Sequence, residues 1–259
     1  LPLLTNFCTV LLFSQKIVLL KREIIENLPV NDTTQITYSL YIPKDFSKDK
    51  KWPLLLLADM EGNDKKVISM FLNAAEEEGY VLAAPKLYDS ISLTNKMVLI
   101  GNTIQRVGDM LPIHTDRIYT GGEDSSGRFA TLAPVLLNGV NGSLAIGASL
   151  ANSELINVKK PFHFVGIISK ENYNYPYMLT DAKLLDRYKF PNQVLIYDGN
   201  GEWPSTAYIQ KGLQLFTLDA MGRKWIPKDS AYIENAYRED LEKVNQLKEI
   251  GDLLWAEQY

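Results

Sequence analysis

Short, continuously apolar segments alternate with amphipathic helical patterns along most of this chain. Residues 52–58 (Trp-Pro-Leu-Leu-Leu-Leu-Ala) are typical of a strand covered on both faces, and residues 65–78 have apolar side chains at helical spacing before Gly79. The same patterns predict strands at residues 80–84, 117–120, 143–148, 162–169 and 193–197, and helices at residues 96–110, 126–137 and 205–221. This order predicts an α/β fold, with a mostly parallel sheet and helices on both of its faces.

The two ends of this alternating region have different patterns. Residues 35–43 alternate between apolar and polar side chains, which predicts a half-buried strand and an antiparallel N-terminal edge of the sheet. No internal repeat is visible, so residues 15–228 are predicted to form one domain. Residues 229–259 are predicted to form a charged helical extension, which either packs on this domain or begins a further helical domain. Its apolar stripe consists of Leu241, Val244, Leu247 and Ile250.

The composition excludes several classes of function. The 259 residues include 27 Lys and Arg against 31 Asp and Glu, so the net charge of −4 provides no basic field for a nucleic acid. Cys8 is the only cysteine, which excludes a disulfide framework and cysteine-based zinc sites. His114 and His163 are the only histidines, so a histidine-rich metal site is excluded as well. We expect no metal and no cofactor, and the partner is predicted to be a small molecule or a protein of unknown identity.

The N-terminal segment predicts export. Residues 1–13 are mostly apolar and are followed by the small Ser14 and two polar residues. An apolar stretch of this length is too short to span a membrane as a helix, but it is typical of the rear part of a secretory signal peptide. Residues 1–14, including Cys8, are therefore predicted to be a signal-peptide remnant, and the protein to be periplasmic or extracellular without a membrane span. The alternative is an N-terminal strand or helix of the core.

Chemistry is expected at the carboxyl ends of the predicted strands, because ligands bind there in parallel sheets. The strand at residues 117–120 continues through Gly121 and Gly122 into a helix, which is the context of the G-x-S-x-G nucleophile elbow. Two further strand ends are followed by the loops Tyr173-Asn174-Tyr175-Pro176 and Tyr197-Asp198-Gly199-Asn200-Gly201-Glu202-Trp203-Pro204. The sequence therefore predicts that these three loops meet at one edge of the sheet.

Two of these segments carry a family resemblance. Asp116-Arg117-Ile118-Tyr119 is similar to the approach to the elbow in the polyhydroxybutyrate-depolymerase and carboxylesterase branch of the α/β-hydrolases, and residues 199–204 resemble that branch's G-x-H-x-W-P ending. The resemblance covers about Thr37 to Trp225, and this branch is found especially among exported bacterial proteins. It implies an α/β-hydrolase fold and ester hydrolysis by a triad of serine, acid and histidine.

The positions of that triad are occupied by other residues. The resemblance aligns Gly122 with the elbow glycine, Asp124 with the nucleophilic serine, Asn172 with the acid and Gly201 with the histidine. In such a triad the histidine takes the proton of the nucleophile and later activates water, and glycine can do neither. We therefore expect a degenerate hydrolase domain, a pseudoenzyme that has lost hydrolytic activity and acts as a ligand-binding or scaffolding module.

Two alternatives to this interpretation remain open. An active esterase could use Asp124, as some α/β-hydrolases do, or Ser125, which has Gly127 two residues on but Glu123 in place of the first glycine. Either nucleophile would need an unconventional base, and Asp124 at a helix start is also explained by capping. His163 is predicted to be a core residue of a strand, and His114 to lie in a surface loop at the amino edge of the sheet. The other alternative is an interaction protein that acts through its C-terminal helices.

The loops also contain candidate ligand-binding side chains. The segment Asp59-Met60-Glu61-Gly62-Asn63 follows the strand at residues 52–58, and its carboxylates are unfavourable beside an oxyanion. Aromatic residues are concentrated in the other loops, where tyrosine and tryptophan can anchor a ligand or a partner. For Trp203 the alternative is packing against the last helix of the domain. The predicted ligand-binding residues are Asp59, Glu123, Tyr173, Tyr175 and Trp203.

Overall fold

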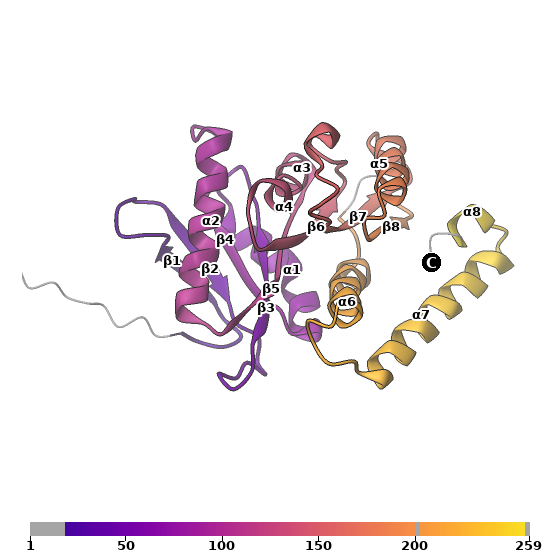
Figure 1. Ribbon diagram of the computed structural model, residues 1–259, viewed down its shortest axis with the longest axis horizontal. Coiled ribbons are helices and arrows are strands. Elements are labelled where there is room, and N and C mark those ends of the chain that lie inside the picture. The colour runs from indigo at the N-terminus through magenta and orange to yellow at the C-terminus, as the bar shows by residue number, and fades with distance from the viewer. Residues whose placement is uncertain (1–18, 200–202, 257–259) are drawn as a thin grey trace, which may run out of the picture.

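The computed structural model describes residues 19–199 and 203–256 of the chain (Figure 1). The predicted signal-peptide remnant at residues 1–14, with Cys8, lies outside the described residues, and so does Gly201. The described part consists of a central sheet between two layers of helices, with two further helices at its C-terminal end.

Eight strands of the described chain form one sheet in the order β1-β2-β4-β3-β5-β6-β7-β8. β2 pairs antiparallel with β1 and β4, and all the other neighbouring strands are parallel. The predicted fold class, a mostly parallel sheet with an antiparallel N-terminal edge, is therefore confirmed. The strands are β1 (Ile24–Pro29), β2 (Thr37–Tyr41), β3 (Trp52–Leu57), β4 (Val81–Pro85), β5 (Ile113–Glu123), β6 (Val140–Ile146), β7 (His163–Ser169) and β8 (Asn192–Tyr197).

Helices cover both faces of this sheet, which explains why its central strands are apolar at every position. In β3, Leu55 and Leu57 pack with α1 and α6, whereas Leu54 and Leu56 belong to the core on the opposite face, with α2 and α3. α5 packs on that same opposite face, over β7 and β8. The helices of the two layers are α1 (Asp64–Glu78), α2 (Leu93–Met110), α3 (Asp124–Ala130), α4 (Ala133–Leu136), α5 (Tyr175–Arg187) and α6 (Thr206–Gly222), with a short 3₁₀ helix η1 (Ser153–Leu155).

Two of the predicted elements differ most from the structure. The strand predicted at residues 117–120 is longer, because β5 already begins at Ile113, which pairs with Trp52 of β3. His114 therefore lies in a strand and not in a surface loop. The single helix predicted at residues 126–137 is divided into α3 and α4, because Pro134 has no N–H group and can only stand near the start of a helix.

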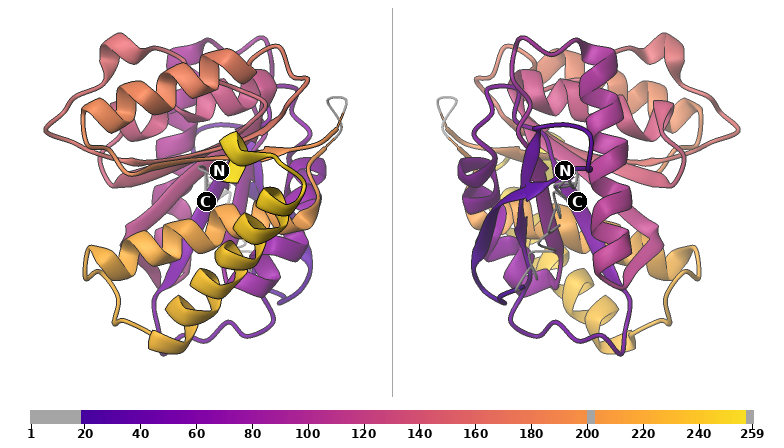
Figure 2. Two further views of the ribbon diagram at one scale, coloured as in Figure 1. Left: turned by 90° about the vertical axis from the view of Figure 1, so that its right-hand side faces the viewer. Right: turned by 90° about the vertical axis from the view of Figure 1, so that its left-hand side faces the viewer.

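The C-terminal extension is helical, as predicted, and consists of α7 (Ser230–Glu249) and α8 (Leu253–Ala256). α7 lies beside α6 (Figure 2), and polar groups join them: Lys211 Nζ lies 2.5 Å from Asp240 Oδ1, and Gln214 Nε2 donates to a carboxylate oxygen of Glu239 at 3.1 Å. The predicted apolar stripe is only partly covered, because Leu247 is buried whereas Leu241 is exposed. None of the helices described is long and apolar enough to cross a membrane.

Candidate active site

The predicted elbow lies beside a cavity of about 230 Å³ at the carboxyl edge of the sheet. The loop after β3 forms one side of the cavity, the first turns of α1 another, and the junction of β5 and α3 the third. We call this space the elbow cavity. Its lining residues are Ala58, Asp59, Glu61, Lys66, Val67, Met70, Glu123, Asp124, Ser125 and Ser126.

The turn from β5 into α3 is tight and has Asp124 at its tip. Asp124 has a φ of +45°, which is uncommon for a residue other than glycine and costs about 1 kcal/mol or more. A Cβ atom on Gly122 would lie 2.8 Å from the carbonyl carbon of Ser126, and one on Gly127 would lie 2.7 Å from the oxygen of Gly122. Capping of α3 by a carboxylate requires neither this φ nor this close approach. The turn therefore has the geometry of a nucleophile elbow with an aspartate at its tip.

Asn172 faces Asp124 across Gly147. A Cβ atom on Gly147, which has a φ of +66°, would lie 2.8 Å from Asp124 Oδ1 and 3.2 Å from Asn172 Nδ2. The loop after β7 orients Asn172, because its Oδ1 accepts a hydrogen bond of 2.8 Å from the backbone N–H of Asn174. The Nδ2 of the buried Asn174 in turn donates to the carbonyl of Gly147 at 2.7 Å. Two of the three predicted triad positions therefore converge at one point.

The loop after β3 offers a poor oxyanion hole. In α/β-hydrolases a backbone N–H of this loop stabilises the negative charge that develops on the substrate. Here the N–H of Met60 donates to Ser126 Oγ at 3.0 Å, and that of Glu61 donates to Asp59 Oδ1 at 2.8 Å. Both donors are therefore already engaged within the protein.

The charge of the elbow cavity is also unsuited to an oxyanion. Among the described residues that line it, Asp59, Glu61, Glu123 and Asp124 carry carboxylates, and Lys66 carries an ammonium group. Burial, and then the neighbouring charge of Asp124, raise the pKa of Glu123, while Lys66 opposes this shift. Burial also raises the pKa of Asp124. A cavity with this lining favours a positively charged ligand over a developing anion.

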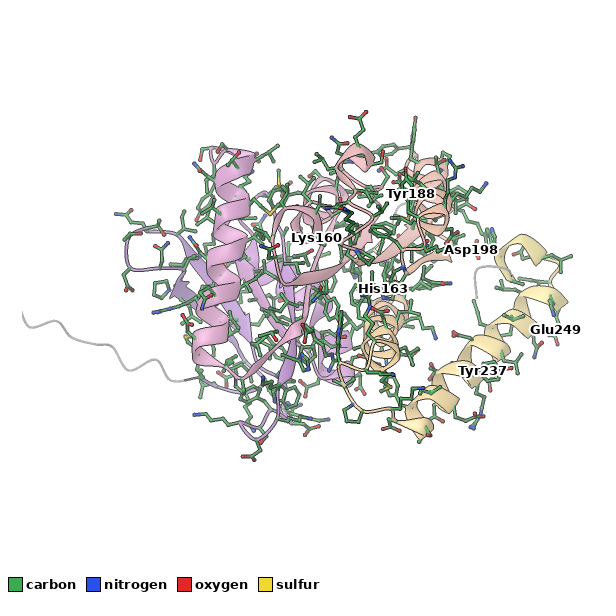
Figure 3. All side chains as sticks on the ribbon, viewed as in Figure 1. Lys160, His163, Tyr188, Asp198, Tyr237 and Glu249 are labelled. Atoms are coloured by element: carbon green, nitrogen blue, oxygen red, sulfur yellow. The ribbon has the colours of Figure 1, made fainter. Side chains whose placement is uncertain are left out.

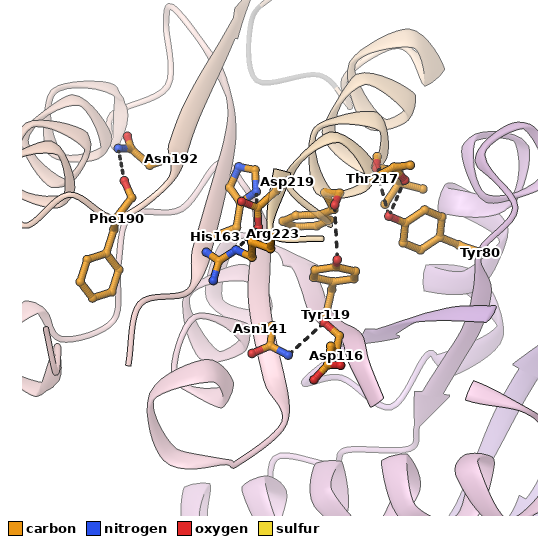
Figure 4. A network of polar contacts seen from close by, with 12 residues as sticks. Tyr80, Asp116, Tyr119, Asn141, His163, Phe190, Asn192, Thr217, Asp219 and Arg223 are labelled. Atoms are coloured by element: carbon orange, nitrogen blue, oxygen red, sulfur yellow. Dashed lines mark hydrogen bonds and ion pairs between the residues drawn. The ribbon is translucent and has the colours of Figure 1, made fainter. Parts of the chain in front are cut away.

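Both histidines lie in the amino-terminal parts of their strands, away from the elbow. His163 begins β7, where its Nδ1 is 3.6 Å from Asp219 Oδ2 and its ring packs edge-on against Phe216 (Figures 3 and 4). Burial raises the pKa of Asp219, but contacts with His163 and Arg223 outweigh it and hold this pKa below its ordinary value. His114 lies near the start of β5, with its Nε2 3.1 Å from the carbonyl oxygen of Trp225.

The predicted ligand-binding residues fall into two groups. Asp59 and Glu123 line the elbow cavity, but the three aromatic residues are not part of its lining. Tyr173 is exposed, Tyr175 packs against the core beneath α5, and Trp203 makes an edge-on contact with Phe71 of α1, with ring centroids 5.6 Å apart. Trp203 therefore packs on the core beside α1, whereas the alternative stated for it was packing against the last helix of the domain.

Sequence reasoning missed three residues of the site. Ser126 was overlooked although it stands at the second glycine position of G-x-S-x-G, where its hydroxyl now accepts the N–H of Met60. Lys66 lines the elbow cavity from the first turn of α1. The sequence pattern of this helix does not indicate that Lys66 has this role. Asn174 was noticed only as part of a tyrosine-rich loop, and its contact with Gly147 joins segments far apart in the sequence.

The order of the strands, the helices on both faces and the sharp turn after β5 define the α/β-hydrolase fold. Solved structures support this assignment. The chain is similar to S-formylglutathione hydrolase FrmB from Staphylococcus aureus, with a TM-score of 0.60, 14% identity, and coverage of 75% of this chain and 96% of that one. It is also similar to a phosphonate-inhibited esterase B from Lactobacillus rhamnosis, with a TM-score of 0.60, 12% identity, and coverage of 79% and 89%.

A further similar structure is FphF, a fluorophosphonate-binding serine hydrolase from Staphylococcus aureus, with a TM-score of 0.60, 13% identity, and coverage of 75% of this chain and 98% of that one. At these identities the comparisons establish the fold and leave the activity open. No model of a protein family and no curated protein sequence matches the chain.

Proposed function

We propose that this protein is a degenerate α/β-hydrolase that does not hydrolyse esters and acts as a ligand-binding or scaffolding module. The observation that carries the proposal is Asp124 at the tip of the elbow, facing Asn172 across Gly147. Asp124 has no hydroxyl group to attack an ester, and the neutral amide of Asn172 cannot stabilise a histidinium ion as a carboxylate would. The resemblance to the polyhydroxybutyrate-depolymerase and carboxylesterase branch supports the proposal, because its triad positions fall on these two residues and on Gly201.

The supply of a general base also argues against turnover. If Asp124 attacked a substrate as a carboxylate, the resulting ester would still need a base to activate the water that releases it. The chain has glycine at position 201, and among the described residues His114 and His163 lie far from the elbow, at the amino ends of β5 and β7. A covalent intermediate on Asp124 would therefore accumulate without being hydrolysed.

The ligand that suits the elbow cavity carries a positive charge. Its four carboxylates attract an ammonium or guanidinium group, and Lys66 only partly offsets them. The volume of about 230 Å³ accommodates such a group at the end of a small molecule or of a protein side chain. The elbow cavity therefore suits the ligand-binding part of the proposal.

A serine-directed fluorophosphonate probe is expected to leave the purified protein unlabelled. Ser125 lines the elbow cavity and is exposed, but a serine hydroxyl without an adjacent base is a weak nucleophile. Labelling is measured by intact-protein mass spectrometry, with heat-denatured protein as the background. Labelling that disappears in Ser125→Ala and persists in the neighbouring Ser126→Ala would establish the alternative, an esterase that uses Ser125.

The proposal includes export. When the protein is expressed with its natural start, cleavage is expected between residues 13 and 15, where the apolar stretch ends at the small Ser14. N-terminal sequencing of the mature protein measures this directly. A mature chain that keeps residues 1–13 would rule out a cleaved signal peptide and favour an N-terminal segment of the core.

An interaction through the C-terminal helices is a second candidate function, and one observation favours it. Ile233, Tyr237 and Leu241 recur every four residues along α7, and all three are exposed. Figure 3 shows Tyr237 on this outlying helix. A row of exposed apolar side chains on one helix face is a common feature of surfaces that bind another protein.

A further inference from the structure

A second cavity, of about 460 Å³, lies at the opposite edge of the sheet from the elbow. The amino ends of three neighbouring parallel strands form its floor: residues 50–53 at the start of β3, residues 78–79 before β4, and the first half of β5. Residues 225–227, which follow α6, close one side. Because ligands of α/β sheets usually bind at the carboxyl edge, nothing in the fold itself accounts for an open cavity here. We call it the amino-edge cavity.

Arg117 of β5 lines the amino-edge cavity and is only 8% exposed. Its Nη2 donates to Thr217 Oγ1 at 3.1 Å, and its guanidinium lies 5.7 Å from the ring centre of Tyr80. Within the part of the chain that the structure describes, its Nε has no hydrogen-bond acceptor and no carboxylate lies within ion-pair distance. Charged side chains are almost never this deeply buried without a partner of opposite charge.

The groups behind Arg117 are neutral hydrogen-bonding partners and do not balance its charge. Tyr80 Oη and Thr217 Oγ1 are 3.1 Å apart, and Tyr80 also donates to the carbonyl of Leu213 at 3.0 Å (Figure 4). The Oη of Tyr119 donates to the carbonyl of Phe216 at 3.4 Å. Burial raises the pKa of both Tyr80 and Tyr119, which keeps these phenols protonated. The charge of Arg117 is therefore left to be balanced from the amino-edge cavity, which this residue lines.

The remaining charges of the amino-edge cavity are also mostly positive. Lys50 and Lys51 are exposed and line the cavity, in a protein whose overall charge is −4. Among the described residues that line it, Glu78 is acidic, and both of its oxygens are engaged, by Tyr232 Oη at 2.5 Å and by Gln210 Nε2 at 3.2 Å. The Nδ1 of His114 accepts from the N–H of Asp116 at 3.3 Å, and its Nε2 lies 3.1 Å from the carbonyl oxygen of Trp225, so both ring nitrogens have partners within the protein.

We propose that the amino-edge cavity binds a small organic oxyanion, a phosphate or carboxylate group on an apolar body, with Arg117 as its anchor. A guanidinium group binds either anion through two parallel hydrogen bonds. Lys50 and Lys51 attract the anion at the mouth. The apolar body packs against Trp225 and Ile226, which line the cavity and are only partly buried. The site is separate from the elbow cavity, and its occupation does not depend on the function proposed for that cavity.

Phenyl phosphate is the probe for this site. Inorganic phosphate and phenol, which correspond to its anionic and its apolar part, are tested separately for comparison. Titration calorimetry and tryptophan fluorescence, to which Trp52 and Trp225 contribute, measure the binding. We expect saturable binding of phenyl phosphate and of benzoate, and binding of inorganic phosphate at least about 10-fold weaker, because it buries no apolar surface. Arg117→Gln is expected to weaken the binding of phenyl phosphate by about 30-fold or more.

Matched lysine variants test the site without touching the buried arginine. Replacing Lys50 and Lys51 together by glutamine is expected to weaken the binding of phenyl phosphate about 2- to 10-fold. Lys48→Gln, in the same loop but outside the lining, is expected to leave this binding unchanged. The proposal is overturned if the native protein binds neither phenyl phosphate nor benzoate. It is also overturned if the native protein and Arg117→Gln bind phenyl phosphate with equal affinity. If Arg117→Gln does not fold, equal affinities in the two lysine variants overturn it.

Discussion

Rebuilding the triad at the mapped positions is expected to create an esterase. The combination of Asp124→Ser, Asn172→Asp and Gly201→His supplies a nucleophile, a general base and an acid that orients the base. Hydrolysis of p-nitrophenyl acetate by this triple variant is expected to exceed that of the unchanged protein by about 10²-fold or more, because a positioned general base contributes at least that much. Each single variant is expected to stay at the background rate.

The structure indicates how to improve this variant. Ser126 Oγ occupies the N–H of Met60, so Ser126→Gly both completes the G-x-S-x-G motif and frees this N–H for an oxyanion. Added to the triple variant, this change is expected to increase hydrolysis by about a further 10²-fold, the effect of one oxyanion-hole donor. Ser126→Ala is the matched control, because it frees the same N–H but keeps a side chain.

One result would contradict the mapping of the triad. Hydrolysis in Gly201→His alone, with Asp124 and Asn172 unchanged, would mean that a nucleophile is already present and lacks only a base. The interpretation would then move to an esterase with Ser125 or Asp124 as its nucleophile. Steady-state rates at several substrate concentrations, after a check of folding by circular dichroism, distinguish these outcomes.

Gly127→Ala is expected to destabilise the elbow. The new Cβ would lie 2.7 Å from the carbonyl oxygen of Gly122, and neither backbone segment can move without disturbing the turn that holds Asp124. Overpacking of this kind costs about 1–3 kcal/mol and occasionally more. In a domain of this size, a loss of 1 kcal/mol lowers the melting temperature by about 2–4 °C.

Gly108→Ala provides the matched control, because Gly108 also lies in a helix. Its Cβ would have no heavy atom within 4 Å, so the substitution is expected to raise the free energy of unfolding by about 0.5–1 kcal/mol through helix propensity alone. Chemical denaturation of the two variants beside the native protein measures both effects. A Gly127→Ala variant as stable as the native protein would mean that the turn is looser than the structure shows.

Much of the fold could be predicted because it depends on local patterns. The apolar run of β3 identified a strand covered on both faces, and the alternating pattern at residues 35–43 identified the antiparallel edge. The boundaries were less accurate, since β5 is extended by pairing with Trp52 and the helix after it is interrupted near Pro134. Strand pairing and the placement of a proline depend on partners that no local pattern contains.

The candidate site was only partly predictable for the same reason. The order of the motifs pointed to Asp124 and Asn172 at one edge, and their convergence at Gly147 is now visible. The mapping of Gly201 remains a prediction, and the roles proposed for Tyr173 and Tyr175 have no counterpart in the lining of the elbow cavity. The sequence does not show in which direction the aromatic side chains of a loop point.

By itself the sequence determined the residue types: an aspartate, an asparagine and a glycine where a related hydrolase would have its triad, and histidines only in other segments. Residue type limits chemistry directly, because glycine has no side chain that could act as a general base in any fold. Only the tertiary structure decided that Ser126 occupies the N–H of Met60 and that Arg117 is buried beside a cavity, with no counter-charge among the residues described. Burial and hydrogen bonding arise between segments far apart in the chain, so they follow from packing and not from local pattern.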